Sequence, residues 1–309
     1  MPVVERVADS CELGEGPHWD VDTQSLYYVD IFEHSIHKYT PSTKTHTKAI
    51  VGDDTVSFII PIEGAPNKYL ISFGRQVAVI SWDGVSDKVV GFKKITEVDT
   101  EEGSLENRIN DAKCDPTGRL WCGTMGPEPI KGHITPLKGS FYSVDSNGEV
   151  KRHVTPVSCS NGLAWSSDGT KFYYIDSGTR EIHQYDVDLS NGMISNKTVV
   201  FSFEDVSIEG FPDGQTIDTD GNLWVAVFAG YKVIKIDPRR YNTLLETIDI
   251  PSKQVTSVAF GGPNLDELYV TSASFTIDGV VLPPPNHGAL YRVTGLGVKG
   301  CPGVKAKIE

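Results

Sequence analysis

The chain has 309 residues, with 28 Lys and Arg against 41 Asp and Glu, which gives a formal net charge of −13 at pH 7. Nucleic acids and anionic membranes bind clustered basic residues, so this acidic balance disfavours both as partners. No apolar run reaches the ~18 residues of a membrane span, and the first residues lack the apolar core of a signal peptide. The five cysteines are widely spread and lack metal-type spacing, which is typical of reduced thiols. We therefore expect a cytoplasmic monomer that binds a small molecule.

One sequence unit recurs along the chain. In its clearest copy, residues 107–125, the turn Asp115-Pro116-Thr117-Gly118 precedes the strand-like run Leu120-Trp121-Cys122. Aligned copies place an aromatic marker 41 to 52 residues after the previous one, at Tyr28, Tyr69, Trp121, Tyr173, Trp224 and Tyr269. A second series of strand-like runs alternates with the first. Each period therefore supplies two hairpins, or four short strands, which is the content of one propeller blade.

The repeat predicts an all-β fold. We expect a six-bladed β-propeller with four antiparallel strands per blade, forming a single domain over residues 1–309. Residues 3–7 alternate like a strand but precede the first unit. In a ring this segment can pair with the last blade, which closes the circle and covers an open sheet edge.

Three loops differ from the repeat. Residues 97–106 are acidic, as a solvated surface loop often is. Residues 126–139 and 274–287 form long irregular loops rich in Gly and Pro. Binding groups concentrate in long loops on a rigid scaffold, so we expect these two loops to contribute to a site.

The sharpest signal is one column of the repeat alignment. The positions eleven residues before Leu26, Trp121, Phe172 and Trp224 are polar, and they are Glu15, Asn110, Asn161 and Asp213. Equivalent positions in a propeller lie at equal radius, so these side chains would surround the central channel. Carboxylate and amide oxygens suit a hard cation such as Ca²⁺ or Mg²⁺. The absence of His from the column argues against a dedicated zinc site.

A simpler interpretation of the column stays open. Asn161-Gly162 and Asp213-Gly214 are pairs that also occur in turns, so they could cap the mouth of the channel. Glu15-Gly16 favours a site, because Glu is a poor turn residue.

Two further residues are expected on the same face. Arg108 lies two residues before Asn110, so strand alternation points both side chains the same way. Glu128 follows the second strand of that hairpin, which returns the chain to the end where it began. Together they form a plausible wall for a hydroxyl or carbonyl group. Alternatively, Arg108 pairs with the acidic loop 97–106.

Several of these motifs resemble one family. They are Gly14-Glu15-Gly16-Pro17, Arg108-Ile109-Asn110-Asp111, Ser160-Asn161-Gly162-Leu163 and Pro212-Asp213-Gly214. The chain resembles the regucalcin (senescence marker protein)/gluconolactonase family over essentially its whole length. Within that family it is most similar to the luciferin-regenerating members, in residues 173–178, 213–218 and 255–265.

The resemblance implies a six-bladed propeller with one divalent cation on its axis. The implied metal ligands are Glu15, Asn161 and Asp213, and Asp213 would also be the general base. Arg108, Asn110 and Glu128 would contact the substrate, so the family places Asn110 on the substrate and not on the metal. Ca²⁺ is the first candidate for the cation, followed by Mg²⁺, Mn²⁺ or Zn²⁺.

The implied activity is that of a metal-dependent hydrolase of the gluconolactonase type. In the luciferin-regenerating members it converts oxyluciferin to 2-cyano-6-hydroxybenzothiazole, which cysteine turns back into luciferin. Two alternatives remain at this point: a hydrolase that opens sugar lactones, and a non-catalytic calcium-binding regulator like regucalcin.

Overall fold

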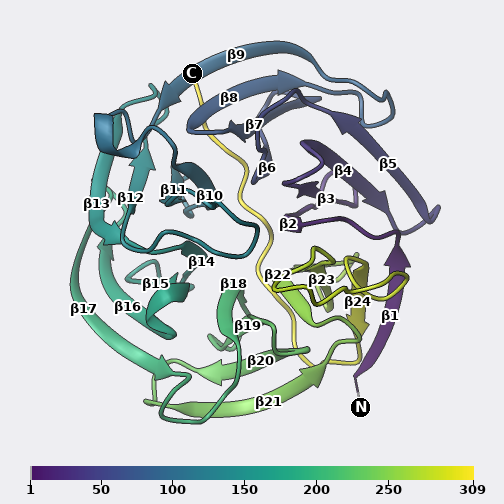
Figure 1. Ribbon diagram of the computed structural model, residues 1–309, viewed down its shortest axis with the longest axis vertical. Helices are drawn as coiled ribbons and strands as arrows, with labels where there is room; N and C mark the ends of the chain where they lie inside the picture. Colours follow the sequence, from purple (N-terminus) through teal and green to yellow (C-terminus); the bar gives the residue numbers. More distant parts are fainter. Residues whose placement is uncertain (1) are drawn as a thin grey trace.

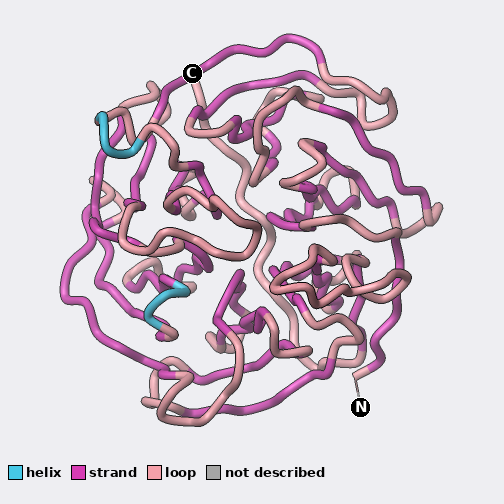
Figure 2. Tube along the Cα trace, viewed as in Figure 1, coloured by secondary structure: helices cyan, strands magenta, loops and turns pink. Residues whose placement is uncertain are grey.

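The computed structural model describes residues 2–309, which form an all-β propeller with sheets arranged around a centre (Figure 1). Within each sheet, neighbouring strands pair antiparallel. The helical segments among these residues are two single 3₁₀ turns, η1 (Glu102–Ser104) and η2 (Ser177–Thr179), drawn in cyan in Figure 2. The predicted all-β propeller fold is therefore confirmed.

Four sheets contain four strands each, in chain order. The first is β2 (Gly14–Asp20), β3 (Ser25–Asp30), β4 (Ser35–Thr40) and β5 (Thr45–Ile50). The second is β6 (Ile59–Pro61), β7 (Lys68–Phe73), β8 (Gln76–Ser81) and β9 (Val90–Glu97). The third is β10 (Arg108–Cys114), β11 (Leu120–Met125), β12 (Gly139–Val144) and β13 (Val150–Val157). The fourth is β14 (Ser160–Trp165), β15 (Lys171–Asp176), β16 (Glu181–Asp188) and β17 (Met193–Ser202).

The remaining strands form one eight-stranded sheet. One half is β18 (Phe211–Ile217), β19 (Leu223–Phe228), β20 (Lys232–Asp237) and β21 (Thr243–Asp249). The other half is β22 (Gln254–Gly261), β23 (Glu267–Ala273), β24 (Leu290–Thr294) and β1 (Val3–Ala8). A single residue pair, Phe228 with Gln254, joins β19 to β22. The N-terminal strand β1 pairs with β24 from Val3 opposite Thr294 to Ala8 opposite Leu290.

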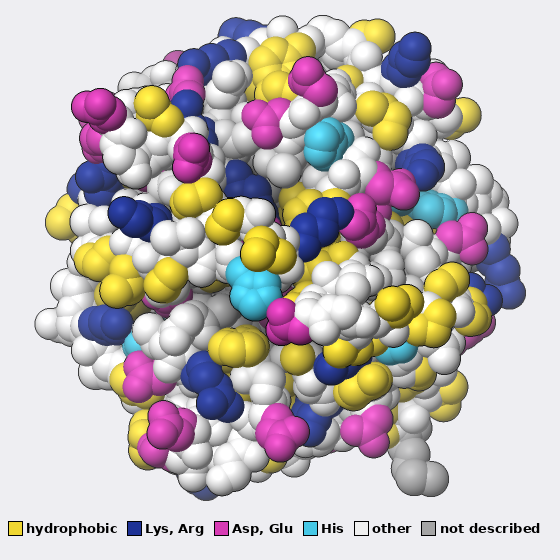
Figure 3. All heavy atoms as spheres, viewed as in Figure 1, with side chains coloured by type: hydrophobic (Ala, Val, Ile, Leu, Met, Phe, Trp, Pro, Cys, Tyr) yellow, Lys and Arg dark blue, Asp and Glu magenta, His cyan; other side chains and the backbone are white. Residues whose placement is uncertain are grey.

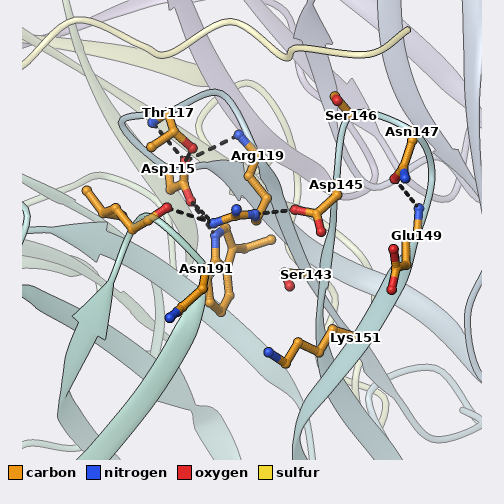
Figure 4. Close-up of polar contacts among 12 residues, drawn as sticks. Asp115, Thr117, Arg119, Ser143, Asp145, Ser146, Asn147, Glu149, Lys151 and Asn191 are labelled. Atoms are coloured by element: carbon orange, nitrogen blue, oxygen red, sulfur yellow. Dashed lines mark hydrogen bonds and ion pairs between the residues drawn. The ribbon is translucent and has the colours of Figure 1, made fainter.

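The turn predicted at Asp115 is organised by its carboxylate (Figure 4). Asp115 Oδ1 accepts hydrogen bonds from the backbone N–H groups of Thr117 (2.8 Å) and Arg119 (3.2 Å). Its Oδ2 accepts from the indole N–H of Trp121 at 2.9 Å. The turn and the first buried aromatic of the following strand are thus held by one side chain. Asp218 repeats the contact with Trp224 Nε1 at 3.0 Å.

The first strands of the units lie innermost and contact one another from sheet to sheet. Two units have no charged or amide residue in the column, and Ser57 and Thr256 lie at or next to the equivalent positions. Both are buried, and their hydroxyls donate to backbone carbonyls of the neighbouring unit, Ser57 to Ile109 O and Thr256 to Gly14 O, each at 2.5 Å. These two hydroxyl groups therefore link neighbouring units of the ring, and they add no polar group to its channel.

The C-terminal segment crosses the ring at the end where the Asp115 turn lies (Figure 1). Its backbone pairs with three different units, through Lys299 O with Thr219 N, Ala306 O with Glu63 N and Lys307 N with Gly118 O, each within 2.9 Å. Gly118 lies in the turn that follows the last residue of β10. The C-terminal segment therefore lies at the end of the ring opposite to the first residues of β10. Among residues 2–309, no helix has the length and apolarity needed to cross a bilayer.

Candidate active site

The four column residues lie at irregularities in the innermost strands. The pairing register shifts just after Glu15 in β2, across Asn110 in β10, just after Asn161 in β14 and across Asp213 in β18. Such β-bulges bend a strand and redirect a side chain. The interpretation of Asn161 and Asp213 as turn residues at the channel mouth is wrong, because both lie inside strands.

The glycines that follow two of these residues allow adjacent strands to approach closely. A methyl group on Gly162 would stand 2.8 Å from the carbonyl oxygen of Asp213. On Gly214 it would stand 2.0 Å from Ser257 Oγ. Glycine is needed at such positions because no other residue lacks the Cβ atom. The Asn-Gly and Asp-Gly pairs therefore reflect packing around the channel.

The structure brings all six predicted site residues to one cavity of about 360 Å³. They are Glu15, Arg108, Asn110, Glu128, Asn161 and Asp213. This volume lies within the range of ligand pockets, ~300–1,000 Å³. Hydrophobic and charged side chains meet around the centre of the face shown in Figure 3. The geometry agrees with the predicted set, whereas the role of each residue stays a prediction.

Two buried carboxyl groups, Glu15 and Asp213, lie on the floor of this cavity. Burial, with a further contribution from the nearby carboxylate of Asp111, raises the pKa of Glu15 to about 8. Burial also raises the pKa of Asp213 well above its usual range, with further contributions from Glu15 and Asp111. The guanidinium of Arg108 lies close enough to oppose both shifts. Its charge does not balance the carboxylates, so a bound cation would relieve their repulsion.

The donor set fits a hard divalent cation. Among residues 2–309, no three His, Cys, Asp or Glu side chains come close enough to one another to hold a metal ion. The predicted ligands are two carboxylates and one amide oxygen, a mixture that Ca²⁺ and Mg²⁺ accept. Glu15, Asn161 and Asp213 are therefore the residues that would hold it.

Hydrogen bonds orient the amides of the site. Asn161 donates through Nδ2 to Ser177 Oγ at 2.8 Å, so its Oδ1 is the atom left for a ligand. Asn110 Nδ2 donates to that Oδ1 at 3.1 Å and to Ser160 O at 2.9 Å. Arg108 Nη1 in turn donates to Asn110 Oδ1 at 2.7 Å. The predicted alternative that Arg108 pairs with loop 97–106 is wrong, because its side chain faces the cavity and Glu128.

The two long loops meet over the cavity. Glu128 accepts a hydrogen bond from the backbone N–H of Gly132, which folds loop 126–139 on itself. His133 Nε2 lies 2.8 Å from Asp278 Oδ1 of loop 274–287. Both loops contribute to the cavity lining, so the expectation that they take part in the site is met in position.

The cavity wall above the polar floor is apolar. It is formed by Leu13, Ile31, Met125, Ile134, Pro136, Phe211, Phe228 and Phe275. The rings of Phe228 and Phe275 stack with centroids 6.1 Å apart. Ile134, Pro136 and Phe275 lie in the two loops that the sequence predicted to contribute to the site. The other members were not predicted, because they come from separate units and look like ordinary core residues.

The fold and the cavity define a β-propeller with a candidate metal-assisted active site on its axis. Residues 13–274 match the family model described as "SMP-30/Gluconolactonase/LRE-like region". The chain belongs to this family.

Two solved structures and one curated relative illustrate the similarity. A luciferin-regenerating enzyme superposes with a TM-score of 0.94, with 48% identity and complete coverage of both chains. A calcium-binding protein, regucalcin, from Agrobacterium tumefaciens has a TM-score of 0.85, with 25% identity over 99% of this chain and 98% of its own. Regucalcin from Danio rerio is 35% identical over 297 residues, which cover 96% of this chain and 95% of the relative.

Proposed function

We propose that the protein is a metal-dependent hydrolase that converts oxyluciferin to 2-cyano-6-hydroxybenzothiazole, from which cysteine can regenerate luciferin. The observation that carries the proposal is the combination of an apolar, partly aromatic wall with an acidic floor in one cavity. A flat bicyclic substrate can pack against Phe228 and Phe275. Its reacting carbonyl would then lie toward Asp213. The similarity to a luciferin-regenerating enzyme supports the same substrate.

The proposed reaction balances as a hydrolysis. Water adds to the carbonyl carbon of the thiazolone ring, and the bond from that carbon to nitrogen breaks. The carbon–sulfur bond at the former ring position 2 then breaks, which forms the nitrile and releases thioglycolate. One water is consumed, and no oxidant or reductant is required. Opening a lactone needs the same first step, so one site can serve both reaction types.

The side chains supply positioning and proton transfer. Glu15, Asn161 and Asp213 would hold the cation, which when bound polarises a carbonyl oxygen and acidifies water. Asp213 takes the proton of the attacking water, because a carboxylate has a second oxygen free for that task. Arg108 donates a hydrogen bond to a substrate oxygen atom, whereas Asn110 Oδ1 and Glu128 accept hydrogen bonds from donors on the substrate. The two long loops contribute to the lining of the cavity beside these groups.

A second candidate function is the opening of sugar lactones. The polar groups of Arg108, Asn110 and Glu128 favour it, because together they could bind several hydroxyl groups. A purely calcium-binding regulator is the third reading, supported by the regucalcin relatives. Calcium binding alone does not require the apolar wall of the cavity.

For the scaffold, we propose that each half of the eight-stranded sheet is one blade, because a single residue pair joins them. The ring then has six blades and one domain, and the pairing of β1 with β24 closes it. We also propose that the protein acts as a cytoplasmic monomer. Its five free thiols agree with a reducing compartment.

A comparison of substrates tests the proposal. Purified protein with Ca²⁺ or Mn²⁺ is assayed with oxyluciferin and with an aldonolactone, and with Phe275→Ser as the variant. We expect the wild-type protein to turn over oxyluciferin. In Phe275→Ser, turnover of oxyluciferin should fall more than turnover of the aldonolactone, because the serine removes aromatic contact area. Turnover of the lactone alone would establish the second candidate. No turnover of either substrate, with metal binding retained, would establish the third.

A further inference from the structure

Ser177 joins two of the candidate metal ligands through one hydroxyl group. It lies at the start of η2, directly after β15, and it lines the cavity. Its Oγ accepts the hydrogen bond from Asn161 Nδ2 at 2.8 Å. The same hydroxyl donates to the carbonyl oxygen of Pro212 at 2.7 Å. Pro212 immediately precedes Asp213, so the hydroxyl connects the bulges that carry Asn161 and Asp213.

The contact to Asn161 fixes which end of the amide faces the cavity. An Asn side chain can present either its oxygen or its NH₂ group, and only the oxygen can bind a cation. Because Ser177 uses its hydrogen to bind Pro212 O, its oxygen is left as an acceptor. Because the Ser177 oxygen is an acceptor, the NH₂ group of Asn161 must face it. The Oδ1 atom of Asn161 then points away from Ser177 and toward the cavity. Cys159 Sγ, 3.6 Å from Asn161 Nδ2, also accepts on this side.

The contact to Pro212 fixes the backbone beside Asp213. Both the Ser177 side chain and Asp213 are at most 8% exposed, so water does not readily replace the bond. The segment holding Ser177 is itself anchored, because Asp176 accepts hydrogen bonds from Cys159 N (3.0 Å) and Gly178 N (3.2 Å). The Ser177 hydroxyl therefore fixes the position of β18 at Pro212 relative to β14 at Asn161.

We propose that Ser177 is a positioning residue of the candidate metal centre, which orients the Asn161 oxygen and sets the place of Asp213 relative to it. This inference rests on the proposed metal site, and it is independent of the substrate. Groups that orient metal ligands in this manner typically change metal affinity ~10–100-fold when removed.

The test is calorimetric titration of Ca²⁺ and of Mn²⁺ into chelator-stripped protein. We compare wild type with Ser177→Ala, Ser177→Thr and Ser272→Ala. Ser272 is the matched control, because its buried hydroxyl also donates to a backbone carbonyl, Ala289 O at 2.7 Å, and it does not line the cavity. We expect Kd to rise ~10–100-fold in Ser177→Ala, to return toward the wild-type value in Ser177→Thr, and to stay unchanged in Ser272→Ala.

Melting temperatures of the metal-free proteins separate positioning from folding. We expect a decrease in both variants and a somewhat larger one in Ser177→Ala, because Ser177 makes two of these buried hydrogen bonds and Ser272 makes one. Wild-type metal affinity in Ser177→Ala, or an equal loss of affinity in Ser272→Ala, would overturn the proposal. Failure of the wild-type protein to bind either cation would overturn it together with the metal site. Metal binding without oxyluciferin turnover would remove the proposed substrate and leave the assignment of Ser177 intact.

Discussion

Asn110 Nδ2 donates a hydrogen bond to Asn161 Oδ1 across 3.1 Å, which links β10 to β14 at the centre of the ring. Asn161 is a predicted metal ligand, whereas Asn110 is a predicted substrate contact. An amide oxygen has two lone pairs, so Asn161 Oδ1 can accept this bond and still bind a cation. In the proposed function this hydrogen bond would couple substrate binding to metal binding, and the following predictions separate the two.

Removal of Arg108 should affect the substrate more than the metal. In Arg108→Ala, kcat/KM should fall ~10–100-fold, the equivalent of a charged hydrogen bond of ~1.5–3 kcal/mol. Metal Kd should change less than about threefold, because the guanidinium is no ligand. Steady-state kinetics and calorimetry provide the two readouts. Arg108→Lys keeps the charge and loses the planar fork, so it should recover little activity. Loss of metal binding in Arg108→Ala would instead give Arg108 a structural role.

Metal affinity should depend on pH through Glu15. Without metal its folded pKa is about 8, against a usual value of 4.5, so the carboxyl holds a proton at neutral pH. A cation must displace that proton, and the apparent affinity should rise about tenfold per pH unit up to about pH 8 for each proton released. Above that pH it should level off. Calorimetric titrations in buffers of different ionisation enthalpy measure the release.

The raised pKa of Glu15 also makes the stability of the metal-free protein depend on pH, but this stability falls as pH rises whereas metal affinity increases. A folded pKa above the unfolded value gives stability that is fully present below pH 4.5 and is lost as pH rises through about 8. The melting temperature of metal-free protein should therefore fall over this range. Glu15→Gln cannot ionise at this position, so its decrease should be smaller. An identical pH profile for both proteins would contradict the assignment.

The roof of the cavity can be tested with two glycines. A methyl group on Gly132 would stand 2.8 Å from Ile277, whereas one on Gly279 would have no atom within 4 Å. Both residues have positive φ, +85° and +76°, so Gly132→Ala and Gly279→Ala carry similar backbone strain. Only Gly132→Ala should push the loops apart, which should raise KM for oxyluciferin several-fold. Equal KM values for the two variants would show that loop contact does not shape the site.

The turn at Asp115 should contribute strongly to stability. Asp115 is fully buried and binds two backbone N–H groups and Trp121, so Asp115→Ala should cost ~3 kcal/mol in the free energy of unfolding. Asp168 binds Thr170 N at 3.1 Å in the corresponding turn of the next sheet, but it is exposed. Asp168→Ala should cost under ~1 kcal/mol. Urea unfolding of both variants measures the difference, and equal costs would contradict the role of burial.

Repetition made part of this architecture predictable. The column that contains Asn161 and Asp213 repeats at a fixed distance from a buried aromatic, so the sequence alone indicated which side chains share the channel. The β-bulges that redirect them were not predictable, since a register shift depends on the partner strand. Ser177 was also missed as a functional group, because its contacts join residues 16 and 35 positions away in the chain. The wall residues outside the two long loops, such as Phe211 and Phe228, were missed for the same reason.

The central claim is that a divalent cation held by Glu15, Asn161 and Asp213 supports hydrolysis of oxyluciferin. The most direct measurement is chromatographic detection of 2-cyano-6-hydroxybenzothiazole after incubation of oxyluciferin with chelator-stripped protein, with and without added Ca²⁺ or Mn²⁺, alongside Asp213→Asn. We predict product only when metal is restored to the wild-type protein, and none from Asp213→Asn. Full activity of the chelator-treated protein, or wild-type turnover by Asp213→Asn, would contradict it.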